Sequence, residues 1–245
     1  VVALYGNYML IVMGVQTLMT AMFNSMNAGI GNLVAEGDKR KIMSVFAELF
    51  SIRFLFSCIM CFGVLMITPA FVSFWIGKKY VMDSLSLLLM TAILFVNLSR
   101  TTVDAYINAY GLFGDIWAPI VEASLNVGLS IILGYYFGLH GVLSGVLISL
   151  LLVVFCWKPY YLFRKGLDER LSIYIFMYAR HLMAALLCGV IVCLGMRYSM
   201  VQGDTTFFDG LLGILVFSIL STLTLLCVAP GMRNLMRRFI RMCHV

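Results

Sequence analysis

The chain has 245 residues and a formal net charge of +6 at pH 7; 62% of its residues are hydrophobic and 11% are charged. Ordinary soluble domains contain roughly 25% charged residues, so this composition excludes that class and indicates an integral membrane protein. The apolar runs are continuous and do not alternate, which predicts membrane-spanning helices and excludes a transmembrane barrel.

Uncharged stretches long enough to cross about 30 Å of hydrocarbon predict the spanning helices. In chain order, the seven predicted spans lie near residues 5–33, 46–74, 84–108, 116–137, 141–157, 173–195 and 207–229. The expected fold class is therefore an all-α membrane protein, a helical bundle over residues 1–230 followed by a basic tail over residues 231–245. Neither an initiator Met nor a positively charged leader precedes the first apolar run, so we expect the chain to be part of a longer protein.

Basic residues are divided unequally between the two sides of this predicted bundle. One side receives Lys39, Arg40, Lys41, Lys158, Arg164, Lys165, Arg170, Arg233, Arg237, Arg238 and Arg241, and the other receives Lys78, Lys79 and Arg197. The first side is assigned to the cytoplasm because Lys and Arg accumulate in short cytoplasmic loops. The C-terminus is then cytoplasmic. We expect the basic segments to anchor this topology and not to bind nucleic acid or one specific lipid.

The third predicted span carries charged residues in the stretch "NLSRTTVDAYINAY". Arg100, Asp104 and Asn108 recur at intervals of four, so they project from one face of a helix. An ionisable group in hydrocarbon costs several kcal/mol unless it meets a partner, other protein or water. This face is therefore expected to point away from lipid.

Two other predicted spans have similar polar stripes. Glu122, Asn126 and Ser130 lie along the fourth span, and Gln16, Thr20, Asn24 and Asn27 lie along the first. Stripes of Asn, Ser and Thr alone are explained by hydrogen bonds between helices in a dry bundle. The ionisable residues fit that explanation less well, so we favour a shared water-filled cavity. Its predicted lining residues are Arg100, Asp104, Asn108, Glu122, Asn126, Gln16 and Asn24.

Other residues in the spans are given structural interpretations. Glu48 is expected at the membrane interface. Arg53, five residues later, does not share a helix face with Glu48. Cys58 and Cys61 have redox or metal-type spacing but lie in an apolar run with no second pair, so they are interpreted as packing residues. The GxxxG spacings of Gly134 with Gly138 and of Gly141 with Gly145 predict close helix packing.

Two function classes find little support in these features. A retinal-type receptor would need a Lys in the seventh span, and the stretch "FFDGLLGILVFSILSTLTLLCV" has none. A membrane-embedded enzyme is also poorly supported, because His140, His181 and His244 are isolated and no carboxylate cluster has metal-ligand spacing. We therefore expect no catalytic residue, metal site or cofactor, and a transporter-like bundle remains.

Several stretches follow one another between Tyr5 and Gly166: "YGNYMLIV", "NAGIGNLVAEGDKRKIMSVF", "FWIGKKYVMDSLSLLLM", "INAYGLFGDIWAPIVEASLNVGLSIILGYYFGLHGVLSGVLIS" and "KPYYLFRKG". In this order and spacing they resemble the C-terminal half of bacterial Wzx-type polysaccharide flippases, which export O-antigen and capsule units. This family belongs to the MOP superfamily, together with the MATE antiporters. The resemblance implies two helical lobes around an alternately opening cavity, with this chain as the C-terminal lobe and the N-terminal lobe as its partner.

The function implied by the resemblance is the flipping of undecaprenyl-pyrophosphate-linked oligosaccharides across the bacterial inner membrane. Arg100 is then the candidate for attracting the anionic headgroup, and Asn24, Asn126 and Gln16 are candidates for hydrogen bonding to sugars. Asp104 and Glu122 are candidates for neutralising Arg100 or for binding a coupling cation, Na⁺ or H⁺. The alternative is a MATE-like antiporter that exports organic cations, whose cavity is expected to be net acidic.

Overall fold

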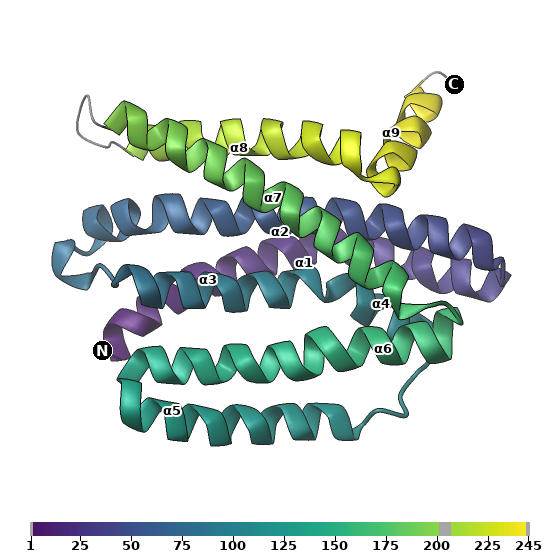
Figure 1. Ribbon diagram of the computed structural model, residues 1–245, viewed down its shortest axis with the longest axis horizontal. Helices are drawn as coiled ribbons and strands as arrows, with labels where there is room; N and C mark the ends of the chain where they lie inside the picture. The colour runs from purple at the N-terminus through teal and green to yellow at the C-terminus, as the bar shows by residue number, and fades with distance from the viewer. Residues whose placement is uncertain (1, 201–206, 244–245) are drawn as a thin grey trace.

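A computed structural model describes residues 2–200 and 207–243, which form a bundle of long helices without strands (Figure 1). The α-helices are α1 Val2–Glu36, α2 Lys39–Trp75, α3 Ser84–Ser99, α4 Thr101–Ala109, α5 Trp117–Leu150, α6 Lys158–Leu162, α7 Leu171–Met200, α8 Phe207–Val228 and α9 Pro230–Cys243. A 3₁₀ turn, η1 (Lys78–Tyr80), follows α2, and the π-helical turns η2 (Leu151–Trp157) and η3 (Phe163–Leu167) flank α6. The predicted all-α fold class is confirmed.

The helices are long and apolar enough for a multi-pass membrane protein. Within the described residues, six continuous helical segments meet the length and hydropathy needed for a membrane span. One of them, Trp117–Leu167, is two spans, because Gly138 has φ 59° and ψ −133° and reverses the chain (Figure 1). The predicted boundary between residues 137 and 141 falls at this turn. Gly138 itself is a turn residue and not a packing residue, since a positive φ is readily adopted only by glycine.

The segment Trp117–Leu167 is thus a hairpin of two helices joined at Gly138. Close packing within this hairpin depends on two other glycines. A Cβ atom added to Gly141 would lie 1.9 Å from the carbonyl oxygen of Leu133, and one added to Gly145 would lie 2.6 Å from the amide nitrogen of Ser130. Both neighbours are backbone atoms that no side-chain rotation can move. The predicted close helix packing at Gly141 and Gly145 is confirmed.

Replacing Gly141 with alanine is therefore expected to destabilise the hairpin by about 1–3 kcal/mol, the usual cost of overpacking. Gly128 provides a matched control in α5, because a Cβ there would meet no atom within 4 Å. Thermal unfolding of the purified protein in detergent should show a lower melting temperature for Gly141→Ala than for Gly128→Ala. Equal melting temperatures would contradict the packing argument.

The second helix of the hairpin is longer than the predicted span 141–157. It continues through η2, α6 and η3 to Leu167. Proline has no N–H to donate, and the helix accommodates Pro159 with a wider turn in which the Lys158 N–H bonds to the Val153 carbonyl, five residues back. This continuation places Lys158 on a helix and not in a loop, which corrects the assignment made from the sequence.

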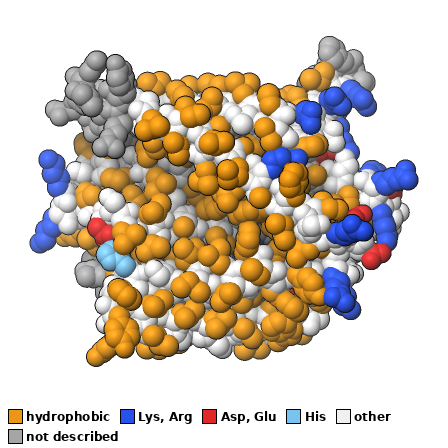
Figure 2. Space-filling view, in the orientation of Figure 1, with side chains coloured by type: hydrophobic (Ala, Val, Ile, Leu, Met, Phe, Trp, Pro, Cys, Tyr) orange, Lys and Arg blue, Asp and Glu red, His pale blue; other side chains and the backbone are white. Residues whose placement is uncertain are grey.

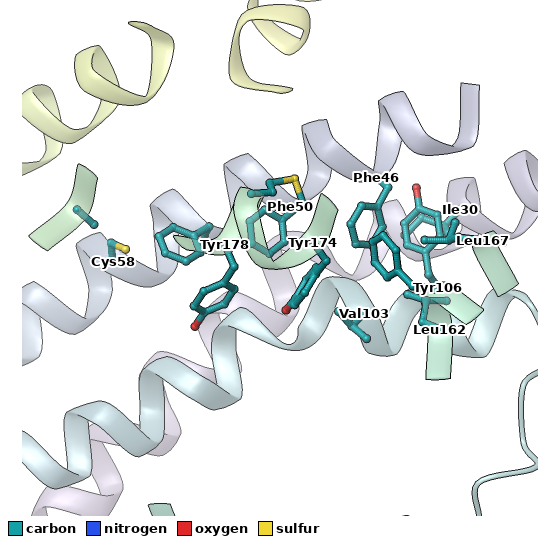
Figure 3. Packing of buried hydrophobic residues seen from close by; sticks show 14 of the residues in the cluster. Ile30, Phe46, Phe50, Cys58, Val103, Tyr106, Leu162, Leu167, Tyr174 and Tyr178 are labelled. Carbon is teal, nitrogen blue, oxygen red and sulfur yellow. The ribbon is translucent and has the colours of Figure 1, made fainter. Parts of the chain in front are cut away.

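An aromatic core holds α2, α4, α7 and the end of the hairpin together (Figure 3). Phe46 of α2 packs edge-on against Tyr106 of α4 at 5.0 Å and against Phe163 of η3 at 5.5 Å, measured between ring centroids. Phe50, one turn along α2, packs against Tyr174 of α7 at 5.7 Å. Edge-to-face pairs of this kind add to the free energy gained from burying the rings, so α2 is the central element of the bundle.

Charged side chains gather mainly at one end of the bundle, which we call the basic end (Figure 2). Here α2 begins, the hairpin ends and α9 begins, and Lys39 at the start of α2 pairs with Asp168 after η3 at 2.9 Å. Glu48, which was predicted to lie at the membrane interface, is buried within the protein near this end and is 3% exposed. It accepts a hydrogen bond from Ser44 and pairs with Arg238 of α9 at 3.3 Å, since α9 packs across α2.

At the opposite end, Asp83 forms the N-terminal cap of α3. Its carboxylate accepts hydrogen bonds from the Ser86 N–H at 3.0 Å and from Nε2 of His140 at 2.7 Å. The His140 hydrogen bond, followed by the Ser86 bond, lowers the pKa of Asp83 to about 2. The carboxylate bonds therefore connect α3 to the hairpin through a group that is ionised at neutral pH.

The lowered pKa of Asp83 predicts a small pH dependence of stability. Because the folded pKa lies below the unfolded value near 3.9, the stabilisation is fully present above about pH 4 and is lost as pH falls towards 2. In Asp83→Asn, which keeps a good N-cap residue, the melting temperature should fall less between pH 5 and pH 2 than in the wild type. An unchanged pH dependence would contradict this assignment.

Candidate functional site

A polar cleft of about 210 Å³ lies between α1, α2, the end of α3 and α4. Its lining residues are Met19, Thr20, Phe23, Asn24, Asn27, Arg53, Leu98, Thr101, Asp104, Ala105 and Asn108. Three asparagine amides, two hydroxyls, a guanidinium and a carboxylate thus meet in one space within the spanning helices. Arg53 is buried and Thr101 and Asp104 are partly buried, whereas Thr20 and the three asparagines are exposed. Polar groups at membrane depth are favourable only where each can bond to protein, water or a ligand.

Arg53 is the most deeply placed charge in this cleft. It lies 14 residues along α2, about 21 Å from the start of the helix, and is 2% exposed. Nη1 donates to the carbonyl oxygen of Thr101 at 3.0 Å, and Nη2 donates to Oδ1 of Asn27 at 2.9 Å. Its guanidinium also lies over the ring of Phe23, 5.3 Å from the centroid. Among the described residues, no carboxylate lies within ion-pair distance, and Nε is buried without a hydrogen-bond partner.

A cluster of charged side chains adjoins the cleft and shares Asp104 with it. Oδ1 of Asp104 accepts a hydrogen bond from Lys158 at 2.8 Å, and Oδ2 of Asp104 forms an ion pair with Nε of Arg100 at 3.2 Å. Nη1 of Arg100 also lies 4.0 Å from Oε1 of Glu122. The cluster therefore connects α4, α5 and α6, and its four side chains are between 18% and 30% exposed.

The third predicted span is divided into α3 and α4 at Arg100. The hydroxyls of Ser99 and Thr101 bond back to the carbonyl oxygens of Val96 and Leu98, a pattern that bends helices. Arg100 itself keeps helical dihedral angles, φ −71° and ψ −20°. Asp104 and Asn108 therefore remain on one continuous face across the bend.

The structure brings together most of the predicted cavity residues. Asn24, Asp104 and Asn108 line the cleft, while Arg100 and Glu122 lie beside it in the charged cluster. Gln16 and Asn126 are not among the residues lining the cleft. The backbone carbonyl of Gln16 accepts a hydrogen bond from the Thr20 hydroxyl within α1. Oδ1 of Asn126 accepts a hydrogen bond from the Ser130 hydroxyl within α5 at 3.1 Å.

Sequence reasoning missed Arg53 and Lys158 as members of this site. Arg53 carried one usable signal, since any arginine in the middle of a spanning helix is a candidate functional residue. Lys158 carried none, because it directly follows the predicted end of the fifth span. Asn27 was recognised in the polar stripe of the first span, but its bond to Arg53 was not predicted.

The isolated histidines and the cysteine pair lie apart from the cleft. His181 is fully buried, with Nε2 at 2.9 Å from Oγ of Ser51 and Nδ1 at 2.7 Å from the Met177 carbonyl. Cys58 and Cys61 are buried free thiols that pack in two separate apolar clusters. His244 lies outside the described residues. Within those residues, no group of three His, Cys, Asp or Glu side chains is arranged to hold a metal ion.

The cleft and the charged cluster together carry a net positive charge. Three cations, Arg53, Arg100 and Lys158, face two carboxylates, Asp104 and Glu122, which leaves one positive charge in excess. An excess cation within spanning helices favours an anionic ligand, because the ligand supplies the balancing charge and accepts hydrogen bonds from the cation. The asparagine amides add donors and acceptors suited to neutral hydroxyl groups.

Comparison with known proteins gives no match to a family model, to a curated protein or to a solved structure.

Proposed function

We propose that the protein is a transporter that moves an anionic, lipid-linked oligosaccharide across the bacterial cytoplasmic membrane by alternating access. The substrate class is an undecaprenyl-pyrophosphate-linked sugar unit for surface polysaccharide, with the C-terminus of the carrier in the cytoplasm. The observation that carries this proposal is the buried Arg53 in a polar cleft with no carboxylate at ion-pair distance among the described residues.

In this proposal the headgroup and its lipid chain use different environments. A pyrophosphate with several sugars cannot enter hydrocarbon alone, so it needs a hydrated route through the protein. Arg53 and Arg100 attract the pyrophosphate, and the amides of Asn24, Asn27 and Asn108 bond to sugar hydroxyls. The prenyl chain stays in the surrounding lipid. The resemblance of the Tyr5–Gly166 region to polysaccharide flippases supports the same substrate class.

The charge balance is the reason for preferring this substrate to an organic cation. A cavity for cations is expected to have an excess of carboxylates, whereas the cleft and the charged cluster together have an excess of one cation. Asp104 and Glu122 are already engaged with Arg100 or Lys158, which leaves neither carboxylate free for a cationic drug.

A vesicle assay separates the two functions. The intact protein is reconstituted with a fluorescent polyprenyl-pyrophosphate oligosaccharide, and a membrane-impermeant quencher reports the fraction that has crossed the bilayer. We expect faster crossing than in protein-free vesicles and no uptake of an organic cation under a Na⁺ or proton gradient. Cation uptake without lipid crossing would reject the proposal and support the antiporter alternative.

A further inference from the structure

A second cationic site lies on the opposite side of α2, between α7 and α9. Arg180 of α7 is partly buried, with an Nε atom that is buried and has no hydrogen-bond partner. Its guanidinium lies over the ring of Phe176, one turn earlier in α7, at 5.7 Å from the centroid. Neither the cleft nor the charged cluster uses this residue.

Arg180 and Arg233 each lie one turn from an alanine that packs in the same apolar cluster. Ala184, one turn after Arg180 on α7, shares an apolar cluster with Ala229, which lies one turn before Arg233. On both helices, the arginine lies one turn nearer to the basic end than the alanine.

The two arginines lack a balancing charge. Among the described residues, no carboxylate lies within ion-pair distance of either one, and Glu48, which is nearby on α2, is already paired with Arg238. Arg233 also lies in the first turn of α9, where the helix dipole disfavours a cation and favours an anion. Two like charges near each other repel, and an anion between them offsets this repulsion.

Arg180 lies within the predicted span 173–195, and its long side chain can extend towards the headgroup level at the basic end. Helix α7 has 30 residues, about 45 Å, whereas the hydrocarbon is about 30 Å thick, so the helix extends beyond it. Arg180 lies nine residues from Leu171, about 14 Å from the helix end at the basic end of the bundle. Phe176 is 69% exposed and offers an apolar surface beside the charge, as an acyl chain requires.

The sequence led us to expect only general topology anchoring from the basic segments, Arg233 included. The unpartnered Nε of Arg180 changes that expectation, and we propose that Arg180 and Arg233 form a binding site for the phosphate of an anionic phospholipid in the leaflet at the basic end of the bundle. The lipid phosphate accepts hydrogen bonds from both guanidinium groups, including the unpartnered Nε of Arg180, while its acyl chains lie along α7 beside Phe176. This site is independent of the proposed transport function, because it uses neither the cleft nor the charged cluster.

Lipid retention by the intact protein tests this proposal. The protein is purified from phosphatidylcholine bilayers containing a minority of phosphatidylglycerol, and native mass spectrometry counts the phosphatidylglycerol molecules that remain bound. Arg180→Gln and Arg233→Gln should each lower phosphatidylglycerol affinity about tenfold, the size expected when a hydrogen bond to a charged group is lost. Arg241→Gln, two turns further along α9, is the matched control and should retain the lipid.

Three outcomes would overturn the site. Wild-type retention in both Arg180→Gln and Arg233→Gln would exclude a specific contact, and an equal loss in Arg241→Gln would show general surface attraction. Competition by inorganic phosphate at the same concentration as the lipid would show an anion site that does not require a lipid. Arg233 is exposed, so its variant remains informative even if Arg180→Gln fails to fold.

Discussion

Replacement of Arg53 with glutamine is expected to reduce oligosaccharide translocation by at least tenfold while leaving the protein in the membrane. Arg53 supplies the excess positive charge of the cleft, and a hydrogen bond to a charged group contributes about 1.5–3 kcal/mol. Glutamine can still donate towards the Thr101 carbonyl, so it preserves part of the local structure and removes the charge. The vesicle crossing assay measures the rate, and the amount of reconstituted protein is measured in parallel.

Two further variants separate the charge of Arg53 from its structural role. Arg53→Lys keeps the positive charge and should retain more activity than Arg53→Gln, although lysine cannot form the same set of bonds. Arg40→Gln changes an exposed arginine near the start of α2 and should leave translocation unchanged. Equal losses in Arg53→Lys and Arg53→Gln would indicate that Arg53 only holds α1, α2 and α4 together. Normal translocation in Arg53→Gln would reject its proposed role in binding the substrate.

Local periodicity was sufficient to predict much of the fold and part of the site. Arg100, Asp104 and Asn108 share a face because a helix repeats every 3.6 residues, and this spacing is independent of the rest of the chain. The need of Arg100 for a partner also follows from its depth, and Glu122 on the fourth span lies 4.0 Å away. The chain reversal at Gly138 lies in the short gap between two apolar runs.

The remaining contacts depend on tertiary structure. Arg53 bonds to Asn27 and to the Thr101 carbonyl, which are 26 and 48 residues away in the chain. Its own helix is apolar around it, so no spacing rule indicates which neighbours it has. Every residue type has the same backbone carbonyl, so the sequence does not indicate which carbonyl accepts a hydrogen bond from Arg53.

Lys158 illustrates a different reason for failure. A lysine and a proline after an apolar run usually indicate the end of a span. The π-helical turn η2 lets the helix continue, and Lys158 reaches Asp104 on α4, 54 residues earlier. Rules based on residue type predict where helices tend to stop, whereas this helix continues past Lys158 to Leu167 and ends at Asp168, which has a positive φ of 54°.

The Asp104–Lys158 ion pair gives the second large expected effect, on stability. Asp104→Asn leaves the Lys158 ammonium group without a carboxylate at ion-pair distance among the described residues, whereas Arg100 retains Glu122. Loss of one partner of a poorly hydrated pair is expected to lower the free energy of unfolding by about 1–3 kcal/mol. Thermal unfolding in detergent measures this change.

A double-mutant cycle tests whether the two residues act through each other. Lys158→Met removes the ammonium group and keeps much of the side-chain volume, so the Asp104→Asn/Lys158→Met double variant should be more stable than the sum of the single losses predicts. The expected coupling energy is about 0.5–3 kcal/mol, the range for residues in direct contact. The exchanged pair Asp104→Lys/Lys158→Asp should recover part of the stability, because the attraction is retained with its direction reversed. Additive losses and no recovery in the exchanged pair would show that α4 and α6 are held together by packing alone.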